Sequence, residues 1–379
     1  MAKAFALMAN YDDRRSNEVA ATKFPPRKEN LTPEQLALVA GYCALNSNAL
    51  ATAKEAVKFQ RCRYPLDLSQ GAHVLLKHLA EIRKLARIAE FQTMVGHNDF
   101  AAEIVAMTGL ARTLDKEPIL ISKLVRIATL AMAVTAVEHR LNLQSLDDAS
   151  LKLISEAFTK SVPTNQMANG FIGERAMFLS VFQMSPDEIS KLADSGDEKS
   201  SEPSASSFSS SQALLKLLGF YDRDKRFYLK AMETNFALTT ISPKNAAVIT
   251  NTQEQIFREC ARHHYILSGL LLPALGSSVI KEAKGLAQIY TAQTALAIER
   301  FRLANGKLPK KLDELIPQFL PAVPQDPFDG QPLRYHRLEK GYVIYSIDRD
   351  GEDNGGRERP ADAKSTDKTN YDITFTVER

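Results

Sequence analysis

The sequence lacks tryptophan and has only three cysteines, Cys43, Cys62 and Cys260. Aromatic stacking therefore depends on Phe and Tyr. No CxxC pair is present, and a structural zinc site needs four converging ligands, so we expect no zinc site. Cys43 and Cys62 flank a predicted helix and could form a disulfide in an oxidising compartment. The alternative is that both are small buried side chains.

Long apolar runs are also missing. No uninterrupted stretch approaches the roughly 20 apolar residues of a membrane span, so none is predicted in this chain. The nearest candidate, Tyr265 to Ile280, is interrupted by Pro273 and two glycines and is predicted to be a buried, kinked helix. Residues 1–30 have only a short apolar patch before charges begin, which is not typical of a signal peptide, and we expect a flexible segment. An anchor, if there is one, would have to precede Met1.

Excess charge of one sign is absent as well. The 48 Lys and Arg residues nearly balance the 45 Asp and Glu residues, for a formal charge of +3, and both signs alternate along most segments. Such alternation is typical of solvated helix faces and does not indicate nucleic-acid binding. Protein partners are expected instead. A length of 379 residues with 44% apolar side chains predicts two or three domains with a sizeable core.

Signatures of catalysis are equally scarce. The sequence contains no HExxH, no Gly-x-Ser-x-Gly, no phosphate loop and no Gly-x-Gly-x-x-Gly. Ser278 and Lys281 fit Ser-x-x-Lys, a pattern too short to carry weight without a companion motif. Glu174 and Arg175 are predicted to form a structural ion pair. The seven histidines are scattered and are predicted to lie at the surface or in satisfied core positions: 73, 78, 97, 139, 263, 264 and 336.

What the sequence does contain is helical periodicity from Thr32 to about Phe182. Thr32 can cap a helix that starts at Pro33, and Glu34 suits the positive end of its dipole. Apolar residues then recur at helical spacing in segments 36–43, 75–88, 100–110 and 120–134. Short polar breaks between these segments predict antiparallel neighbours in an α-bundle or an irregular solenoid.

A polar, serine-rich segment at 194–212 is predicted to be a disordered loop. Helical patterns resume at 213–236, where the charged cluster 222–226 is predicted to be a solvated face, and at 253–268 and 279–303. Asn305-Gly306 is a left-handed stop signal. We therefore predict a flexible segment 1–30, a helical domain 31–275 and a different C-terminal domain 276–379.

The last 75 or so residues read differently from the rest. Prolines occur at 309, 317, 321, 324, 327 and 332, and strand-like runs follow at 333–336, 342–346 and 371–377. Alternation in Tyr342–Ser346 predicts a short antiparallel meander. The predicted fold class is α+β, predominantly α.

Ordered motifs in this part resemble the major pseudopilin of type II secretion systems. A long helix ends at Phe301–Pro309 with Asn-Gly and Leu-Pro, and a short helix follows at Leu312–Leu315. The Pro-x-Asp-Pro-Phe-x-Gly turn is at Pro324–Gly330, then come Tyr345-Ser346 and the acidic Asp350-Gly351. The resemblance covers about a quarter of the chain. It implies a pilin-like head, in which the long helix packs on a small antiparallel sheet. The helical part is similar to uncharacterised bacterial envelope proteins.

The resemblance also implies a calcium site in the acidic loop. In the family, calcium ties this loop to the start of the last strand through aspartates and backbone carbonyls, which here correspond to Asp350 and Asp372, with Asp353 and the carbonyl near Ile347 as additions. Hard oxygen ligands of this kind suit calcium. An EF-hand is not predicted, because strands flank the loop and Ala361 occupies the twelfth position. The alternative is a solvated acidic turn.

These observations predict a non-catalytic interaction or scaffold protein on the extracytoplasmic side of the bacterial envelope, linked to secretion or pilus-like machinery. The apolar filament helix of a pseudopilin is replaced here by a large helical region, so assembly into a filament is not expected. An enzyme or ligand-binding protein with its site in the helical domain is the alternative. A deep pocket with converging polar groups would favour it.

Overall fold

The computed structural model describes residues 1–11, 13–59, 61–96, 99–162, 166–185, 188, 219–239, 246–360 and 369–379. The predicted disordered loop 194–212 lies outside these described residues. Within them, the chain is mostly helical and contains a three-stranded antiparallel sheet. The predicted class, α+β with helix predominant, is confirmed.

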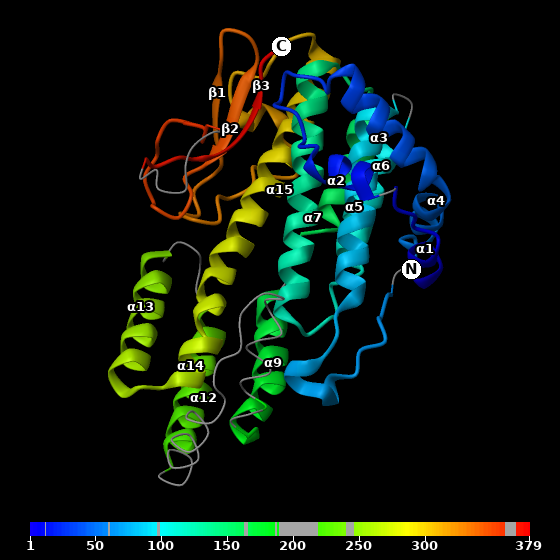
Figure 1. Cartoon of the computed structure of the whole chain (residues 1–379). Coiled ribbons are helices and arrows are strands. Elements are labelled where there is room, and N and C mark those ends of the chain that lie inside the picture. The colour runs from blue at the N-terminus through cyan, green and yellow to red at the C-terminus, as the bar shows by residue number, and fades with distance from the viewer. Residues whose placement is uncertain are drawn as a thin grey trace.

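A bundle of helices forms most of the molecule, with α5, α7 and α15 side by side along its length (Figure 1). Consecutive helices α5, α6 and α7 pack on one another, as the short breaks between them predicted. Helices α3 and α4 flank α5. The bounds of these helices are α1 Ala2–Ala6, α2 Asp13–Ala21, α3 Pro33–Leu45, α4 Ser47–Ala56, α5 Lys77–Val95, α6 Phe100–Arg112, α7 Leu120–Leu143, α8 Asp148–Thr159 and α15 Pro273–Asn305.

Local sequence explains several helix ends. Thr32 caps α3 through a reciprocal capping box with Gln35, and Gly306 ends α15 with φ +66°. Glu174 does not serve the predicted ion pair with Arg175: its buried Oε1 accepts a hydrogen bond from the Leu120 N–H, 3.0 Å away, at the first turn of α7. Burial raises the pKa of this carboxyl, whereas the hydrogen bond lowers it.

A second hydrophobic core joins α9 Gln166–Phe178, α12 Phe220–Leu238, α13 Ala246–His263, α14 Ile266–Leu271 and the start of α15. The predicted solvated cluster 222–226 is corrected at one position. Asp224 is buried, and its carboxylate accepts hydrogen bonds from the N–H groups of Leu267 and Ser268 at 2.9 and 3.1 Å. One acidic side chain of α12 thereby caps the first turn of α14.

The C-terminal sheet packs against the second half of α15 (Figure 1). The order is β1 Arg334–Arg337, β2 Tyr342–Ser346 and β3 Ile373–Val377, with Tyr335 opposite Ile344 and Ile344 opposite Phe375. A short 3₁₀ helix, η4 Leu312–Leu315, precedes them; two others are η1 Leu68–His73 and η2 Leu179–Gln183. The predicted strands and short helix are thus confirmed, with small shifts of their ends.

One hydrophobic core runs from the helical region into the sheet. It includes Leu85 of α5, Val137 of α7, Leu296 of α15 and the buried sheet residues Ile344 and Phe375. The division between 31–275 and 276–379 therefore marks a change of sequence pattern within a shared core.

Side chains of α7 also close the outer edge of β3. The N–H of Thr376 donates to Glu138 Oε1 at 2.7 Å, and its carbonyl accepts from Asn142 Nδ2 at 2.7 Å. The Glu378 N–H donates to Asn142 Oδ1 at 2.8 Å. Because an open strand edge recruits other strands, these two side chains of α7 remove a pairing site.

The N-terminal region contains two short helices, and the structure favours the unbridged alternative for the cysteines. Residues 1–30, expected to be flexible, contain α1 and α2 and bury Ala4 and Val19. Cys43 and Cys62 are not bridged; Cys43 is buried, and burial raises its pKa to about 12. Among the described residues, α7 is long and apolar enough to span a membrane, and 61% of that stretch is buried within the molecule.

Candidate functional site

The Pro324–Gly330 turn places one buried carboxylate at the junction of sheet, turn and loop. Asp326 is 1% exposed. Its carboxylate accepts from Ser346 Oγ at 2.8 Å and from the N–H groups of Ile347 and Phe328, both at 2.9 Å. A buried charge persists only when it is hydrogen-bonded or paired, and Asp326 is both. It fixes the turn to the end of β2.

Arg334 of β1 supplies the opposite charge. Its Nη1 donates to Asp326 at 3.1 Å, its Nε donates to Asp353 at 3.0 Å, and Nη2 donates to Asp329. Burial by itself would lower the pKa of Arg334, but these carboxylates raise it. One guanidinium thus joins the turn, the sheet and the acidic loop.

The four predicted calcium ligands are placed in different local settings. Asp353 accepts from Arg334 and, at 2.9 Å, from the Gly355 N–H, and Asp372 accepts from the Gly356 N–H at 2.7 Å. Exposed Asp350 accepts from the Glu352 N–H of its own loop at 3.3 Å. Ile347 is buried, with its N–H on Asp326. The structure brings Asp353 and Asp372 near each other, and the charge of Asp353 adds to burial in raising the pKa of Asp372.

In this arrangement protein donors already contact the carboxylates of Asp353 and Asp372. Within the described part of the chain, no three His, Cys, Asp or Glu side chains gather in a group that could hold a metal. The cation that Asp353 contacts is the Arg334 guanidinium. Calcium would therefore have to displace Arg334 from Asp353 and draw Asp350 inward.

Residues 358–360, further along the same loop, form one wall of a cleft of about 960 Å³. The other walls are the segment from Ala21 to Gln35 and the α7 residues Thr135, Glu138 and His139. The loop contributes Glu358, Arg359 and Pro360. Both signs of charge line this space, so it suits a polar ligand or a charged peptide segment rather than an apolar one.

Arg27 is the central cation of this cleft. It forms ion pairs with Glu358 and, at 3.5 Å, with Glu138. Its buried Nη1 atom completes no hydrogen bond with the described residues. Burial raises the pKa of Glu138, against the lowering effects of the Thr376 N–H and Arg27. Arg27 thus pairs with acidic side chains from two other segments of the chain, and its buried Nη1 is the atom that faces Glu138.

His139 lies in the same wall. Its Nε2 is 2.7 Å from the Glu29 carbonyl, so this nitrogen is the donor, and its ring stands edge-on to Phe24. Burial is the main reason that its pKa is lowered. A satisfied core histidine was the prediction, and these contacts agree with it. The described residues in and around the cleft show no Ser or Cys activated by a base.

Sequence reasoning missed the cleft entirely. Arg27, Glu138 and Glu358 are separated by more than a hundred residues from one another, and each sits in a segment of ordinary composition. No local spacing signals such a meeting. By contrast, Asp326 belongs to a motif that the sequence analysis had singled out.

Comparisons with known proteins give no further assignment: no family model, no curated protein and no solved structure matches this chain.

Proposed function

We propose that this protein is a non-catalytic interaction or scaffold protein of the bacterial envelope, whose pseudopilin-like head contacts secretion or pilus-like machinery on the extracytoplasmic side. The observation that carries the proposal is the packing of the long helix α15 on a small antiparallel sheet, with a turn between them that is pinned through the motif residue Asp326.

The head in this proposal is attached to its helical region more tightly than a linked module would be. α15 packs on both α7 and the sheet, and α7 hydrogen-bonds to β3. A head attached in this way presents a fixed face to a partner, since the relative position of the two parts is set by a shared core.

The proposal is tested in the source bacterium with the full chain carrying a photoreactive residue at exposed Arg337 of β1. We expect cross-links to envelope proteins of a secretion or pilus-like assembly. The same residue placed at exposed Phe59, on the helical region, is the matched control and should give fewer of these products. Recovery of the protein away from the envelope, without cross-links from either position, would contradict the proposal.

Calcium binding by Asp350, Asp353, Asp372 and the Ile347 carbonyl stays a prediction of the family resemblance. Because Arg334 forms an ion pair with Asp353, calcium that uses Asp353 has to bind tightly enough to replace this ion pair.

A second candidate function is ligand binding in the cleft, favoured by its volume of about 960 Å³ and by the charges of both signs that line it. A ligand that binds the folded state raises the melting temperature. We expect small carboxylates or acidic peptides to do so in the wild type and not in Arg27→Met. No response from a panel of such compounds would remove this candidate.

A further inference from the structure

Helices α4, α6 and α8 form a groove of about 650 Å³. Because α4 and α8 both pack on α6, the residues of α6 provide its floor and the other two helices provide its walls. The floor residues are Ala102, Val105 and Ala106, whose small side chains leave the groove open. Its volume is typical of a small-molecule site, whereas a partner helix with a diameter of about 10 Å would not fit inside it.

The carboxyl ends of the three helices lie together at one end of this groove. Val57, the C-cap of α4, packs against Gly109, near the end of α6. Arg126 donates to Asp115 Oδ1 at 2.6 Å, just after α6, and to the Ser161 carbonyl at 2.7 Å, just after α8. Basic residues from all three helix ends therefore line one groove: Lys58, Arg112 and Lys160.

Two of these cations have no counter-charge in the described part of the chain. Lys58 pairs with Glu55 at 2.6 Å, whereas Arg112 and Lys160 form no ion pair with any described residue. Arg112 is partly buried, and its Nε atom is enclosed without a hydrogen-bond partner among these residues. The negative end of a helix dipole attracts a cation, but it does not supply the missing acceptor. An anion in the groove would supply the counter-charge that a partly buried guanidinium requires.

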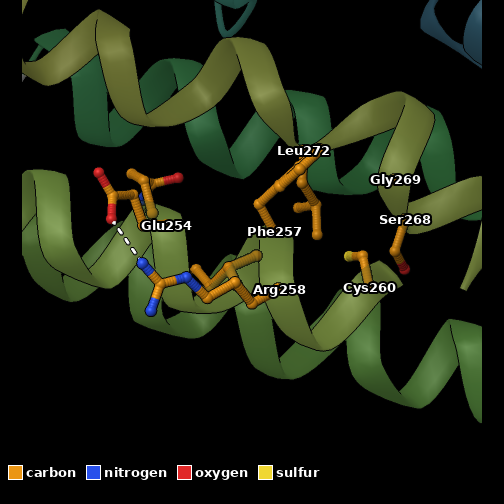
Figure 2. A pocket seen from close by; sticks show the side chains of 9 residues that line it. Glu254, Phe257, Arg258, Cys260, Ser268, Gly269 and Leu272 are labelled. Atoms are coloured by element: carbon orange, nitrogen blue, oxygen red, sulfur yellow. Dashed lines mark hydrogen bonds and ion pairs between the residues drawn. The ribbon is translucent and has the colours of Figure 1, made fainter. Parts of the chain in front are cut away.

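A second hollow, of about 390 Å³ between α13 and α14, shows the opposite case (Figure 2). Most of its lining is apolar and includes Phe257 and Leu272. Its lining cation, Arg258, pairs with the lining carboxylate of Glu254 at 3.1 Å. The charges of this hollow balance within the chain, whereas those of the α4–α6–α8 groove do not.

The groove also has an apolar end. Ala102 precedes Arg112 by nearly three turns of α6, which is about 15 Å along the helix axis. Leu153 of α8, 45% exposed, precedes Lys160 by about two turns. From this separation of an apolar end and a cationic end, we propose that the groove binds a small amphiphilic anion. The ligand is a carboxylate with an unbranched alkyl chain, whose head group contacts Arg112 and Lys160 and whose chain lies along α6.

This inference is independent of the proposed envelope function, and calorimetric titration of the full chain with octanoate tests it. We expect one site with a dissociation constant of about 100 µM, and weaker binding as salt is added because the contact is ionic. Octanol has a similar chain without the charge, and acetate has the charge without the chain. Each should bind at least about tenfold more weakly than octanoate. No binding of octanoate, or equally tight binding of octanol or acetate, would overturn the proposal.

Two variants examine the charged end and the apolar end separately. Arg112→Met keeps an unbranched side chain without the charge, so octanoate should bind at least about tenfold more weakly and with less dependence on salt. Ala102→Leu fills the apolar end and should weaken octanoate binding by about tenfold. Circular dichroism checks the fold of each variant. Lys160→Met, at an exposed position, removes charge from the same end if Arg112→Met does not fold, and it should also weaken binding.

Arg27→Met is the matched control, because it removes an arginine charge from the cleft beside α7 and leaves the groove intact. Octanoate binding by this variant should equal that of the wild type. Unchanged octanoate binding in folded Arg112→Met and Lys160→Met would show that these cations serve the helix ends alone, and the proposal would then be wrong. Loss of octanoate binding in Arg27→Met alone would place the ligand in the cleft and would also contradict it.

Discussion

Two surfaces of this molecule differ in how far the chain itself covers groups that could bind a partner. At the outer edge of β3, backbone donors and acceptors meet Glu138 and Asn142 of α7 at hydrogen-bond distances. At α13 and α14, large apolar side chains such as Phe257 and Leu270 reach solvent. The first surface is closed within the chain, whereas the second leaves apolar side chains in contact with solvent. The β3 edge is therefore not expected to pair with a strand of another chain.

The largest effect on stability is expected from removing the buried carboxylate of Asp326, in the turn before the sheet. Asp326→Ala leaves Arg334 and the donors of Ser346, Ile347 and Phe328 without their buried acceptor. We expect the free energy of unfolding, measured by urea denaturation, to fall by about 3–5 kcal/mol. Asp313→Ala, which removes an exposed carboxylate beside Lys311, is the control and should change it by less than about 0.5 kcal/mol. A loss for Asp326→Ala no larger than the control would contradict the role of this residue.

A smaller loss of stability is expected when the side chains that cover the β3 edge are removed. Glu138→Ala and Asn142→Ala each remove hydrogen-bond partners of β3 and should lower the free energy of unfolding by about 1–3 kcal/mol. Because both residues bind Thr376, their effects should not add in the double variant. Strict additivity would indicate that the two contacts act independently and that the edge is not closed as one unit.

The sequence predicted the features that depend on neighbouring residues and missed those that depend on tertiary packing. The strands, the 3₁₀ turn at Leu312–Leu315, the Thr32 cap and the Gly306 stop depend on neighbours within a few residues, and local patterns carry that information. The burial of Asp224 and the cap that Glu174 provides depend on helices brought together by tertiary packing. In the sequence, an acidic residue that caps another helix cannot be distinguished from one that is exposed to solvent.

The candidate sites divide in the same way. Asp326 could be singled out from its turn motif, whereas its partnership with Arg334 and Asp353 arises only when the loop covers the sheet. The cleft around Arg27 joins segments more than a hundred residues apart, and the hollow at α13 depends on a helix break at His264, where φ is +55°. Histidine is enriched among residues with left-handed backbone, but such residues are a small minority, so the residue type alone does not locate this break.

A modest effect of pH is expected at the β3 edge. Because burial raises the pKa of Glu138, the folded state binds more protons than the unfolded state between the ordinary carboxyl pKa and this raised value. The free energy of unfolding should therefore fall as pH rises through that window. Glu138→Gln keeps an oxygen toward Thr376 but cannot ionise, so its stability relative to the wild type should increase with pH there. Parallel stability curves for the two proteins would rule out this contribution.

The smallest effect concerns calcium at the loop. Because Arg334 already neutralises Asp353, added calcium should raise the wild-type melting temperature only slightly, and Asp372→Asn should abolish the rise. Removing the competing cation in Arg334→Gln should enlarge the calcium response if the ion uses Asp353. An identical midpoint with and without calcium in all three proteins would leave the acidic loop as a solvated turn.

Hydrogen–deuterium exchange of the wild-type chain tests the contrast between the two surfaces most directly. The amides of Thr376 and Glu378 should exchange slowly, since their partners lie in the same chain. The amides of α13 and α14, whose helices leave large apolar side chains exposed, should exchange faster than these two. Rapid exchange at Thr376 and Glu378, or equally slow exchange along α13 and α14, would contradict the account.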